Sequence, residues 1–505
     1  MTIGNPVGAS SAKHLSTWDS IPWSKAKAHV FRLQTRIAKA EREGRRGKVN
    51  ALQRLLTTSF YGKCIAIKRV TSSTGGKTPG VDGVVLRTPQ QKMNALFELK
   101  SRGYKPLPLR RIYIPKKSGT LRPLSIPTIK DRGMQALWHA ALSPIAEERA
   151  DPNAYGFRPK RSTQDAIEQC FKTLARRNSA RWIFEGDIRA CFDRISHEWL
   201  LDNVPMNKTV LRKFLKAGFM EDGKHHATEL GTPQGGIISP TLAVIALSGL
   251  EAKLVSTRKR QRDKEKIHIS TYADDFIVTA ASEQYLKDKV IPIITASLRE
   301  VGLELSTEKS RITKIEDGFN FLGFNVRKYP CEKLLIKPSK ASIKTFLEDV
   351  RAIIKSAIAL PTEILIHQLN QKITGWTNYY KGGVSSQVFA KIDFEIYSAL
   401  ERWCLKRHAR KGKHWIFRKY FTTLAGDNWR FHCTVKDKEG NKKPLYLKRA
   451  TDTHIRRHIK VKAEANPFDP CFKEYFKERE KKIRKAHLPT TAATAGLKSI
   501  SLMRA

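Results

Sequence analysis

The chain has 505 residues, of which 40% are hydrophobic, so it is too long for one ordinary domain and apolar enough to form buried cores. Lys and Arg number 94 against 47 Asp and Glu, and the formal net charge of +47 indicates a polyanionic partner, with nucleic acid as the obvious counter-charge. No run approaches the roughly 18 apolar residues of a membrane helix, so we expect no membrane partner.

The seven cysteines are scattered along the chain and include no C-x-x-C pair. The pattern therefore indicates neither a disulfide framework nor a zinc ribbon. The N-terminus also lacks the apolar core of a signal peptide. We expect a reducing, cytoplasmic location.

The first part of the chain is predicted to be helical after a Ser/Gly/Pro-rich start at residues 1–22. A first helix is indicated by apolar residues at helical spacing up to Gly44, namely Val30, Leu33, Ile37 and Ala40. A second helix is expected over roughly 47–68. The glycine-rich connector at 71–83 could meet phosphate through its backbone N–H groups or be a plain loop, and it lacks the spacing of a nucleotide-binding P-loop.

From about residue 104 to 330, strands and helices alternate, which predicts an α+β or α/β lobe. The segment 110–124 is expected to form a hairpin that turns at Ser118-Gly119. Even spacing puts Arg110, Lys116 and Arg122 on one side of its strands. Three cations in this arrangement could grip a triphosphate.

The segment Tyr272-Ala273-Asp274-Asp275 places two adjacent carboxylates between predicted strands at 267–271 and 276–280. Acidic dipeptides are frequent in surface turns, which is the simpler interpretation. Here the flanking residues are apolar or β-favouring, so the turn is mounted on buried strands, which favours a functional site. Carboxylate oxygens at such a tip are the hard ligands that Mg²⁺ prefers.

A further acid, Asp187, lies at the end of another predicted apolar strand within the segment 182–193. Together Asp187, Asp274 and Asp275 could hold two ions about 3.5–4 Å apart, as two-metal phosphoryl transfer requires. Asp193 follows six residues after Asp187, and we expect it to cap a helix or pair with a nearby base.

The Gly/Pro-rich loop 231–236 could approach a ligand closely and precedes an apolar helix expected from Ser239 to about Leu254. The charged stretch 258–266 is expected to be a solvated loop or a nucleic-acid contact.

Beyond about residue 335 the pattern becomes helical and predicts a separate bundle, with apolar residues Ile343, Phe346, Val350, Ile353, Leu365, Leu369, Ile373, Ile392, Ile396, Leu400 and Trp403 at helical spacing. Basic and aromatic residues interleave at 402–415, as in surfaces that grip nucleic-acid backbone and stack on bases. Core packing explains Trp403 equally well. The segment 430–485 is again basic, and the last twenty residues are expected to be disordered.

A series of blocks occurs in a specific order along the chain: Gly80–Gly83, Ile114–Leu124, Tyr155–Pro159, Asp187–Asp193, Gly231–Pro240, Tyr272–Asp275, Gly302–Lys309 and Phe321–Phe324. In this order the chain resembles the reverse transcriptase/maturase proteins encoded by group II introns, over about residues 18–425. The segment Gly375–Tyr380 looks like the thumb signature of these maturases.

The resemblance implies an α+β right-hand polymerase, with fingers, a palm that contains an antiparallel sheet, an α-helical thumb and a basic C-terminal DNA-binding segment. The implied domains are an N-terminal extension with the start of the fingers (1–85), reverse transcriptase fingers and palm (86–335), a helical thumb or maturase X domain (336–425), a basic DNA-binding domain (426–485) and a tail (486–505).

By the same resemblance, Asp187, Asp274 and Asp275 are the metal ligands, and Arg110, Lys116 and Arg122 contact the triphosphate. Gln234 would touch the incoming nucleotide, and Phe192 would be the ring that excludes a ribose 2′-OH. Lys309 could protonate the departing pyrophosphate or contact a phosphate. The implied cofactor is a pair of Mg²⁺ ions, which removes the need for a side-chain base.

The expected function is RNA-directed DNA polymerisation by a protein that binds its parent group II intron RNA, assists splicing and copies the intron at a DNA target during retrohoming. The expected partners are the intron RNA, a DNA target with its primer strand, and dNTPs. After Asn466–Pro470 only one cysteine follows, so we expect no His/Cys endonuclease. The alternatives are a non-catalytic splicing or chaperone factor, for which intact acids are unfavourable, and a domesticated reverse transcriptase with a host role.

Overall fold

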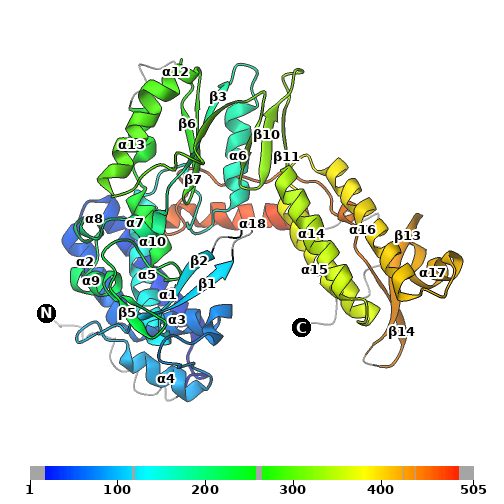
Figure 1. The fold of residues 1–505 in the computed structure, drawn as a ribbon. Coiled ribbons are helices and arrows are strands. Elements are labelled where there is room, and N and C mark those ends of the chain that lie inside the picture. Colours follow the sequence, from blue (N-terminus) through cyan, green and yellow to red (C-terminus); the bar gives the residue numbers. More distant parts are fainter. Residues whose placement is uncertain are drawn as a thin grey trace. The chain divides into compact units, whose positions relative to one another are not determined.

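The computed structural model describes residues 17–115, 119, 121–256, 264–424, 426–437 and 439–487 (Figure 1). The chain divides into two compact units, each built from segments that are distant in sequence. The first contains the described residues of Met1–Ser162, Phe184–Ile312 and Val461–Glu480, and the second those of Thr163–Ile183, Thr313–Lys460 and Lys481–Ala505. Among the described residues, no helix is both long and apolar enough to span a membrane.

The N-terminal part of the first unit is helical, with α1 (Trp23–Arg42), α2 (Arg46–Thr58), α3 (Phe60–Thr71), the short 3-10 turn η2 (Thr74–Lys77), α4 (Pro89–Glu98) and α5 (Ile129–Arg149). The predicted apolar face of α1 is confirmed, since its Val30, Leu33, Ile37 and Ala40 are buried. The helix expected over 47–68 is two helices. Ser59 has extended backbone, and its hydroxyl accepts a hydrogen bond from Gly62 N–H, which begins α3.

The predicted hairpin at 110–124 is confirmed as β1 (Leu109–Pro115) paired antiparallel with β2 (Leu121–Ile126). These strands belong to a four-stranded sheet of order β2-β1-β4-β5, completed by β4 (Phe219–Glu221) and β5 (Lys224–His226). Arg110 lies opposite Ile126, and Ile114 lies opposite Arg122. Arg110 and Arg122 therefore face the same side of the hairpin, about 13 Å apart along the strands. Lys116 lies outside the described residues.

A second four-stranded sheet has the order β6-β7-β3-β8, with β3 (Trp182–Asp187), β6 (His268–Tyr272), β7 (Asp275–Ala280) and β8 (Arg311–Lys314). The strands predicted on both sides of the acidic turn are confirmed to within one residue, and β6 pairs antiparallel with β7. Ile269, Phe276, Ile277 and Val278 are buried, so the acidic turn stands on an apolar base.

Helices of the first unit accompany these sheets: α7 (Cys191–Arg194), α8 (His197–Asn203), α9 (Lys208–Leu215), α10 (Ser239–Ala246), α11 (Leu250–Val255), α12 (Glu283–Tyr285), the π-helical turn η3 (Leu286–Val290) and α13 (Ile291–Glu300). The helix expected from Ser239 to Leu254 is interrupted after Ala246. Gly249 has a φ of 91°, which a continuous helix excludes, and α11 begins after it.

The second unit contains α6 (Thr163–Leu174), a sheet of order β11-β10-β9 and the predicted helices. Its strands and long helices are β9 (Phe319–Phe321), β10 (Phe324–Lys328), β11 (Leu334–Pro338), α14 (Lys340–Ser356), α15 (Thr362–Tyr380) and α16 (Ser386–Arg407). Phe346, Val350, Leu369, Ile396 and Trp403 are buried, which confirms the apolar faces of these helices and favours the packing explanation for Trp403.

Past α16 the second unit contains elements that helical spacing did not predict. These are α17 (Lys413–Tyr420), a three-stranded antiparallel sheet of β12 (Phe421–Leu424), β13 (Asp427–Lys436) and β14 (Lys442–Tyr446), and the 3-10 turn η4 (Ala450–Asp452). Residues 461–480 rejoin the first unit, where Asn466 Nδ2 donates to Glu148 Oε1 at 2.7 Å. They include the turn η5 (Pro470–Phe472) and the start of α18 (Lys473–His487).

Candidate nucleotidyl-transfer site

The acidic turn between β6 and β7 has a tightly defined backbone. Tyr272 pairs with Asp275 across the hairpin, so Ala273 and Asp274 form its tip, and Ala273 adopts a left-handed φ of 61°. Gly156 lies directly against this tip, because a Cβ on Gly156 would stand 2.2 Å from Ala273 N. Tyr155 N–H also donates to Thr271 O at 2.9 Å. The segment at 154–156 therefore supports the turn that carries the carboxylates.

The strand end that carries Asp187 lies beside this turn. β3 is the neighbour of β7 in the sheet, and Ile188 N–H donates to Asp274 O at 3.3 Å. Gly186 makes this approach possible, because a Cβ there would stand 2.2 Å from the Phe276 ring. Asp187, Asp274 and Asp275 thus occupy the adjoining ends of neighbouring strands.

The pKa of the Cys191 thiol is affected by the negative charge of the nearby carboxylates. Its pKa is raised to about 12, first by burial and then by the carboxylates of Asp274, Asp193 and Asp187. Burial and negative neighbours both disfavour a thiolate, so Cys191 is a neutral, unreactive part of the wall. Neighbouring carboxylates of this kind attract a divalent cation.

The three acids supply hard oxygen donors, and this donor set fits Mg²⁺. Within the described ranges, however, no group of three or more Asp, Glu, His or Cys side chains is already gathered as an ion-binding cluster. Asp187 instead faces a cation, with Lys309 Nζ 3.0 Å from its Oδ2. The segment that carries Lys309 is fixed to the same strand, because Ser306 N–H donates to Asp187 O at 2.8 Å.

The 231–236 loop connects the acid-bearing region to the β1–β2 hairpin. On one side Thr232 N–H donates to Phe192 O at 2.6 Å, and on the other Ser125 N–H donates to Gln234 O at 2.8 Å. The side chain of Gln234 lies between the two regions. Its Nε2 donates to Asp193 Oδ2 at 2.8 Å, and its Oε1 accepts from Arg122 Nε at 3.0 Å.

The structure therefore brings Arg122, Gln234 and Asp193 into one hydrogen-bonded chain. A partner for Asp193 in the 231–236 loop was not suggested by the sequence, which favoured a cap or a nearby base. The two residues are 41 positions apart, and no local pattern connects them. Arg110, the other predicted cation of the hairpin, is half-buried, and its Nε has no hydrogen-bond partner among the described residues.

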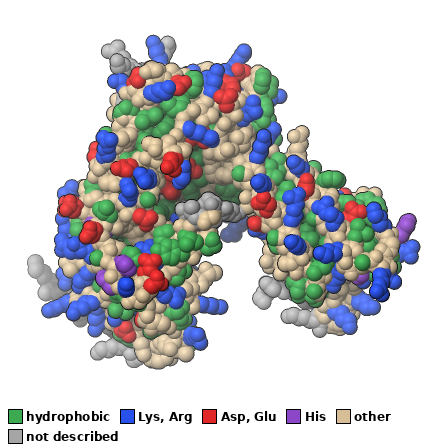
Figure 2. Space-filling view, in the orientation of Figure 1, with side chains coloured by type: hydrophobic (Ala, Val, Ile, Leu, Met, Phe, Trp, Pro, Cys, Tyr) green, Lys and Arg blue, Asp and Glu red, His purple; other side chains and the backbone are tan. Residues whose placement is uncertain are grey.

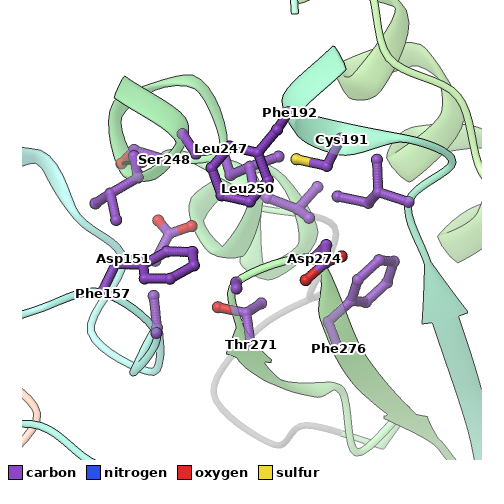
Figure 3. Close-up of a pocket in the computed structure, with 16 residues that line it drawn as sticks. Asp151, Phe157, Cys191, Phe192, Leu247, Ser248, Leu250, Thr271, Asp274 and Phe276 are labelled. Atoms are coloured by element: carbon purple, nitrogen blue, oxygen red, sulfur yellow. Dashed lines mark hydrogen bonds between the residues drawn. The ribbon is translucent and has the colours of Figure 1, made fainter. Parts of the chain in front are cut away.

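Phe192 forms part of a pocket of about 570 Å³, open solvent included, next to the acids (Figure 3). Phe157 and Phe192 meet edge to face there, with ring centroids 5.8 Å apart. Cys191, Phe276, Leu247 and Leu250 add apolar walls, while Asp274 borders the pocket from the acidic turn. The pocket thus presents an aromatic edge beside a carboxylate.

The chain matches three protein-family models in succession. They are the N-terminal domain of reverse transcriptase at residues 18–99, reverse transcriptase (RNA-dependent DNA polymerase) at residues 114–326, and the group II intron maturase-specific domain at residues 343–421. The second match runs from the end of β1 into β10 and includes all three acids.

The chain is also similar to two curated relatives. The chain is 34% identical over 316 residues to protein YkfC of Escherichia coli, which covers 54% of this chain and 82% of that protein. It is 29% identical over 446 residues to the group II intron-encoded protein LtrA of Lactococcus lactis, which covers 69% of this chain and 73% of that protein.

Among solved structures, the chain is similar to telomerase from Candida albicans, with a TM-score of 0.36 and 12% identity over 62% of this chain and 64% of that chain. Apo telomerase from Candida tropicalis gives a TM-score of 0.40 with 13% identity over 63% and 59%. Both likenesses are slight.

Proposed function

This chain belongs to the family of group II intron-encoded reverse transcriptases and maturases, and we propose that its RNA-directed DNA synthesis takes place where β3 meets the β6–β7 turn. The observation that carries this proposal is the hydrogen bond from Ile188 N–H to Asp274 O. It ties the strand end of Asp187 to the turn of Asp274 and Asp275. The proposed catalytic acids are these three aspartates.

Divalent metal dependence is general for reverse transcriptases. Asp187, Asp274 and Asp275 would hold two Mg²⁺ ions, which when bound lower the pKa of a 3′-OH and neutralise charge on the phosphates. The protein itself must keep these carboxylates correctly oriented. The Gly156 contact and the Ile188 hydrogen bond serve that purpose, since both fix the backbone that carries the acids.

The nucleotide would bind between the acids and the β1–β2 hairpin. Arg110, Lys116 and Arg122 would contact its triphosphate, with Lys116 assigned from sequence alone. Gln234 and Lys309 would contribute further polar contacts. Phe192, whose ring meets that of Phe157 edge to face, would meet the sugar and exclude a 2′-OH. These contacts orient the substrate, and orientation with charge neutralisation is most of what phosphoryl transfer needs.

Intron RNA is the partner that follows from the family. The excess of 94 basic over 47 acidic residues supplies the counter-charge for a large folded RNA. Figure 2 shows Lys and Arg side chains spread over the visible face, with acidic side chains in the minority. The proposed further partners are a DNA target with its primer strand and dNTPs.

We propose that the domains have the limits expected from the sequence. Fingers and palm would occupy 86–335 after the N-terminal extension at 1–85. The helices α14, α15 and α16, which overlap the maturase-specific match at 343–421, would form the thumb at 336–425. The basic segment 426–485 would contact DNA.

The test is primer extension on an RNA template with dNTPs and Mg²⁺, together with binding of a structured group II intron RNA. Asp274→Asn and Asp275→Asn should each abolish extension, because an amide removes the charge that holds a cation. Both variants should bind the RNA as the unsubstituted protein does. Asp288→Asn, which removes an exposed carboxylate on η3, is the matched control and should leave both measurements unchanged. Full extension by either aspartate variant would overturn the proposed site.

A further inference from the structure

A side-chain relay joins two parts of the proposed nucleotide site. Asp193 Oδ2 accepts from Gln234 Nε2 at 2.8 Å, and Gln234 Oε1 accepts from Arg122 Nε at 3.0 Å. Asp193 directly follows Phe192 in α7, whereas Arg122 lies on β2. The relay therefore runs from the residue next to the sugar-excluding ring to a residue assigned to the triphosphate.

The chemistry of the two ends fixes the orientation of the amide between them. A carboxylate only accepts hydrogen bonds, and a guanidinium only donates them. If the Gln234 amide turned over, its oxygen would face Asp193 and its NH₂ group would face Arg122, and both contacts would become repulsive. Asp193 and Arg122 thus allow one orientation of Gln234.

The backbone of the 231–236 loop leaves Gln234 little freedom to move away. Gly231 N–H donates to Ile195 O at 2.8 Å, and Gln234 O accepts from Ser125 N–H at 2.8 Å. Gly231 and Gly235 have positive φ values of 81° and 109°. A Cβ on Gly231 would stand 2.5 Å from Asp193 C, and one on Gly235 would stand 2.9 Å from Ser125 O. Close backbone contacts therefore hold the loop between α7 and β2.

The relay also determines which nitrogens of Arg122 remain available. Its Nε is occupied by Gln234 Oε1, whereas its two Nη nitrogens make no hydrogen bond within the described part of the chain. In a guanidinium anchored at Nε, one Nη N–H runs parallel to Nε–H, whereas the outer edge that both Nη groups share faces away from Gln234. Paired N–H groups presented in this way match the oxygens of a phosphate.

We propose that Asp193 is a positioning residue for the incoming nucleotide, which acts by holding the Gln234 amide in the orientation that anchors Arg122 and presents its Nη groups to the triphosphate. This inference rests on the proposed function, because it assigns the triphosphate to Arg122. Asp193 itself touches neither the nucleotide nor the acids in this role. Its loss should therefore weaken nucleotide binding more than the chemical step.

The first test compares KM for dNTP and kcat for primer extension in Asp193 variants. Asp193→Ala removes the acceptor, and we expect KM to rise about tenfold, as for a lost hydrogen bond to a charged group, with kcat within about twofold. Asp193→Asn keeps an oxygen that can accept from Gln234, so KM should rise by only about twofold to threefold. A role limited to folding would lower the thermal midpoint or kcat and leave KM unchanged.

The second test exchanges the chemistry across the pair. Gln234→Glu places a carboxylate opposite Asp193, and we expect KM to rise about tenfold or more. Combining it with Asp193→Asn restores the net charge of the pair, and the new amide can donate to the new carboxylate, which still accepts from Arg122. KM of the double variant should return to within about threefold of the unsubstituted protein. If the fold-changes in KM of the two single variants simply multiply in the double variant, the inference is overturned.

A matched control lies on the surface between α12 and η3. Gln284 Nε2 donates to Asp288 Oδ1 at 2.9 Å, which is the same amide–carboxylate pair at an exposed place. Gln284→Glu, Asp288→Asn and their combination should all leave KM for dNTP unchanged. If they alter KM as the Gln234 and Asp193 variants do, the effect is one of general surface charge and the relay is rejected.

The outcomes also separate this inference from the proposed function. Failure of the unsubstituted protein to extend a primer would reject the proposed function. Extension with KM unaffected by Arg122→Ala would remove Arg122 from the triphosphate site. If Arg122→Ala raises KM and Asp193→Ala does not, only the positioning role of Asp193 is rejected.

Discussion

Lys309 Nζ lies 3.0 Å from Asp187 Oδ2, so the carboxylate that ends β3 is neutralised by a side chain of the same unit. The Lys309 side chain is 68% exposed, and that of Asp187 is 26% exposed. An ion pair of this kind contributes about 0–1 kcal/mol, because water screens it. It is weak enough to open when a divalent cation arrives, and Lys309 would then be free to meet a phosphate.

Removal of this competing charge should ease metal binding. Lys309→Met keeps most of the apolar stem and removes the ammonium, and we expect the Mg²⁺ concentration for half-maximal primer extension to fall by up to about fivefold. The same variant should raise KM for dNTP if the freed lysine meets a phosphate. The measurement is a Mg²⁺ titration at saturating dNTP, followed by a dNTP titration at saturating Mg²⁺. An unchanged Mg²⁺ requirement would show that the ion pair does not persist in solution.

Phe192 should control the choice between deoxyribonucleotides and ribonucleotides. Its ring packs edge to face against that of Phe157, with centroids 5.8 Å apart. We expect Phe192→Ala to reduce the preference for dNTP over rNTP by about 100-fold, which is the discrimination that an apolar pocket achieves against an added hydroxyl. This preference is measured by incorporation of a single nucleotide from a mixture in which dNTP and rNTP compete. Phe192→Tyr keeps the ring and should retain the preference, and equal selectivity in the Ala variant would remove Phe192 from this role.

Gly156 should be essential to the shape of the acidic turn. A Cβ at this position would stand 2.2 Å from Ala273 N, where only backbone could give way. We expect Gly156→Ala to lower the extension rate at least about tenfold and to destabilise the first unit by about 1–3 kcal/mol. Gly47→Ala, in α2 with nothing within 4 Å of the new Cβ, is the control and should be neutral or slightly stabilising. Wild-type rates for Gly156→Ala would show that the turn does not depend on this contact.

The strands that carry the acids could be predicted from the sequence, as could the common side of the hairpin on which Arg110 and Arg122 lie. Both depend on the period-two geometry of strands. The long helices of the second unit followed from the spacing of buried residues such as Phe346 and Leu369. Local chemistry overrode such spacing at Ser59, where a side-chain cap divides the expected helix. The partner of Asp193 could not be predicted, since it comes from the tertiary placement of a loop 41 residues away.

His139 should make the protein sensitive to mild acid. Arg69 Nη1 lies 2.8 Å from its Nδ1, and because a guanidinium only donates, this ring nitrogen must carry a lone pair. Burial, with a smaller contribution from the charge of Arg69, lowers the pKa of His139 to about 3 from an ordinary value of 6.5. In the unfolded chain the His139 imidazole therefore binds a proton below about pH 6.5. In the folded protein it binds that proton only near pH 3.

The free energy of unfolding should accordingly fall as pH decreases through this window, with His139 contributing a slope of up to about 1.4 kcal/mol per pH unit. His139→Gln keeps an oxygen that can accept from Arg69 and cannot take up the proton. We expect the variant to lose less stability than the unsubstituted protein between pH 6 and pH 4, as measured by urea denaturation at each pH. The exposed His367, changed to Gln, is the matched control. Parallel curves for His139→Gln and the unsubstituted protein would show that His139 is protonated equally in the folded and unfolded states.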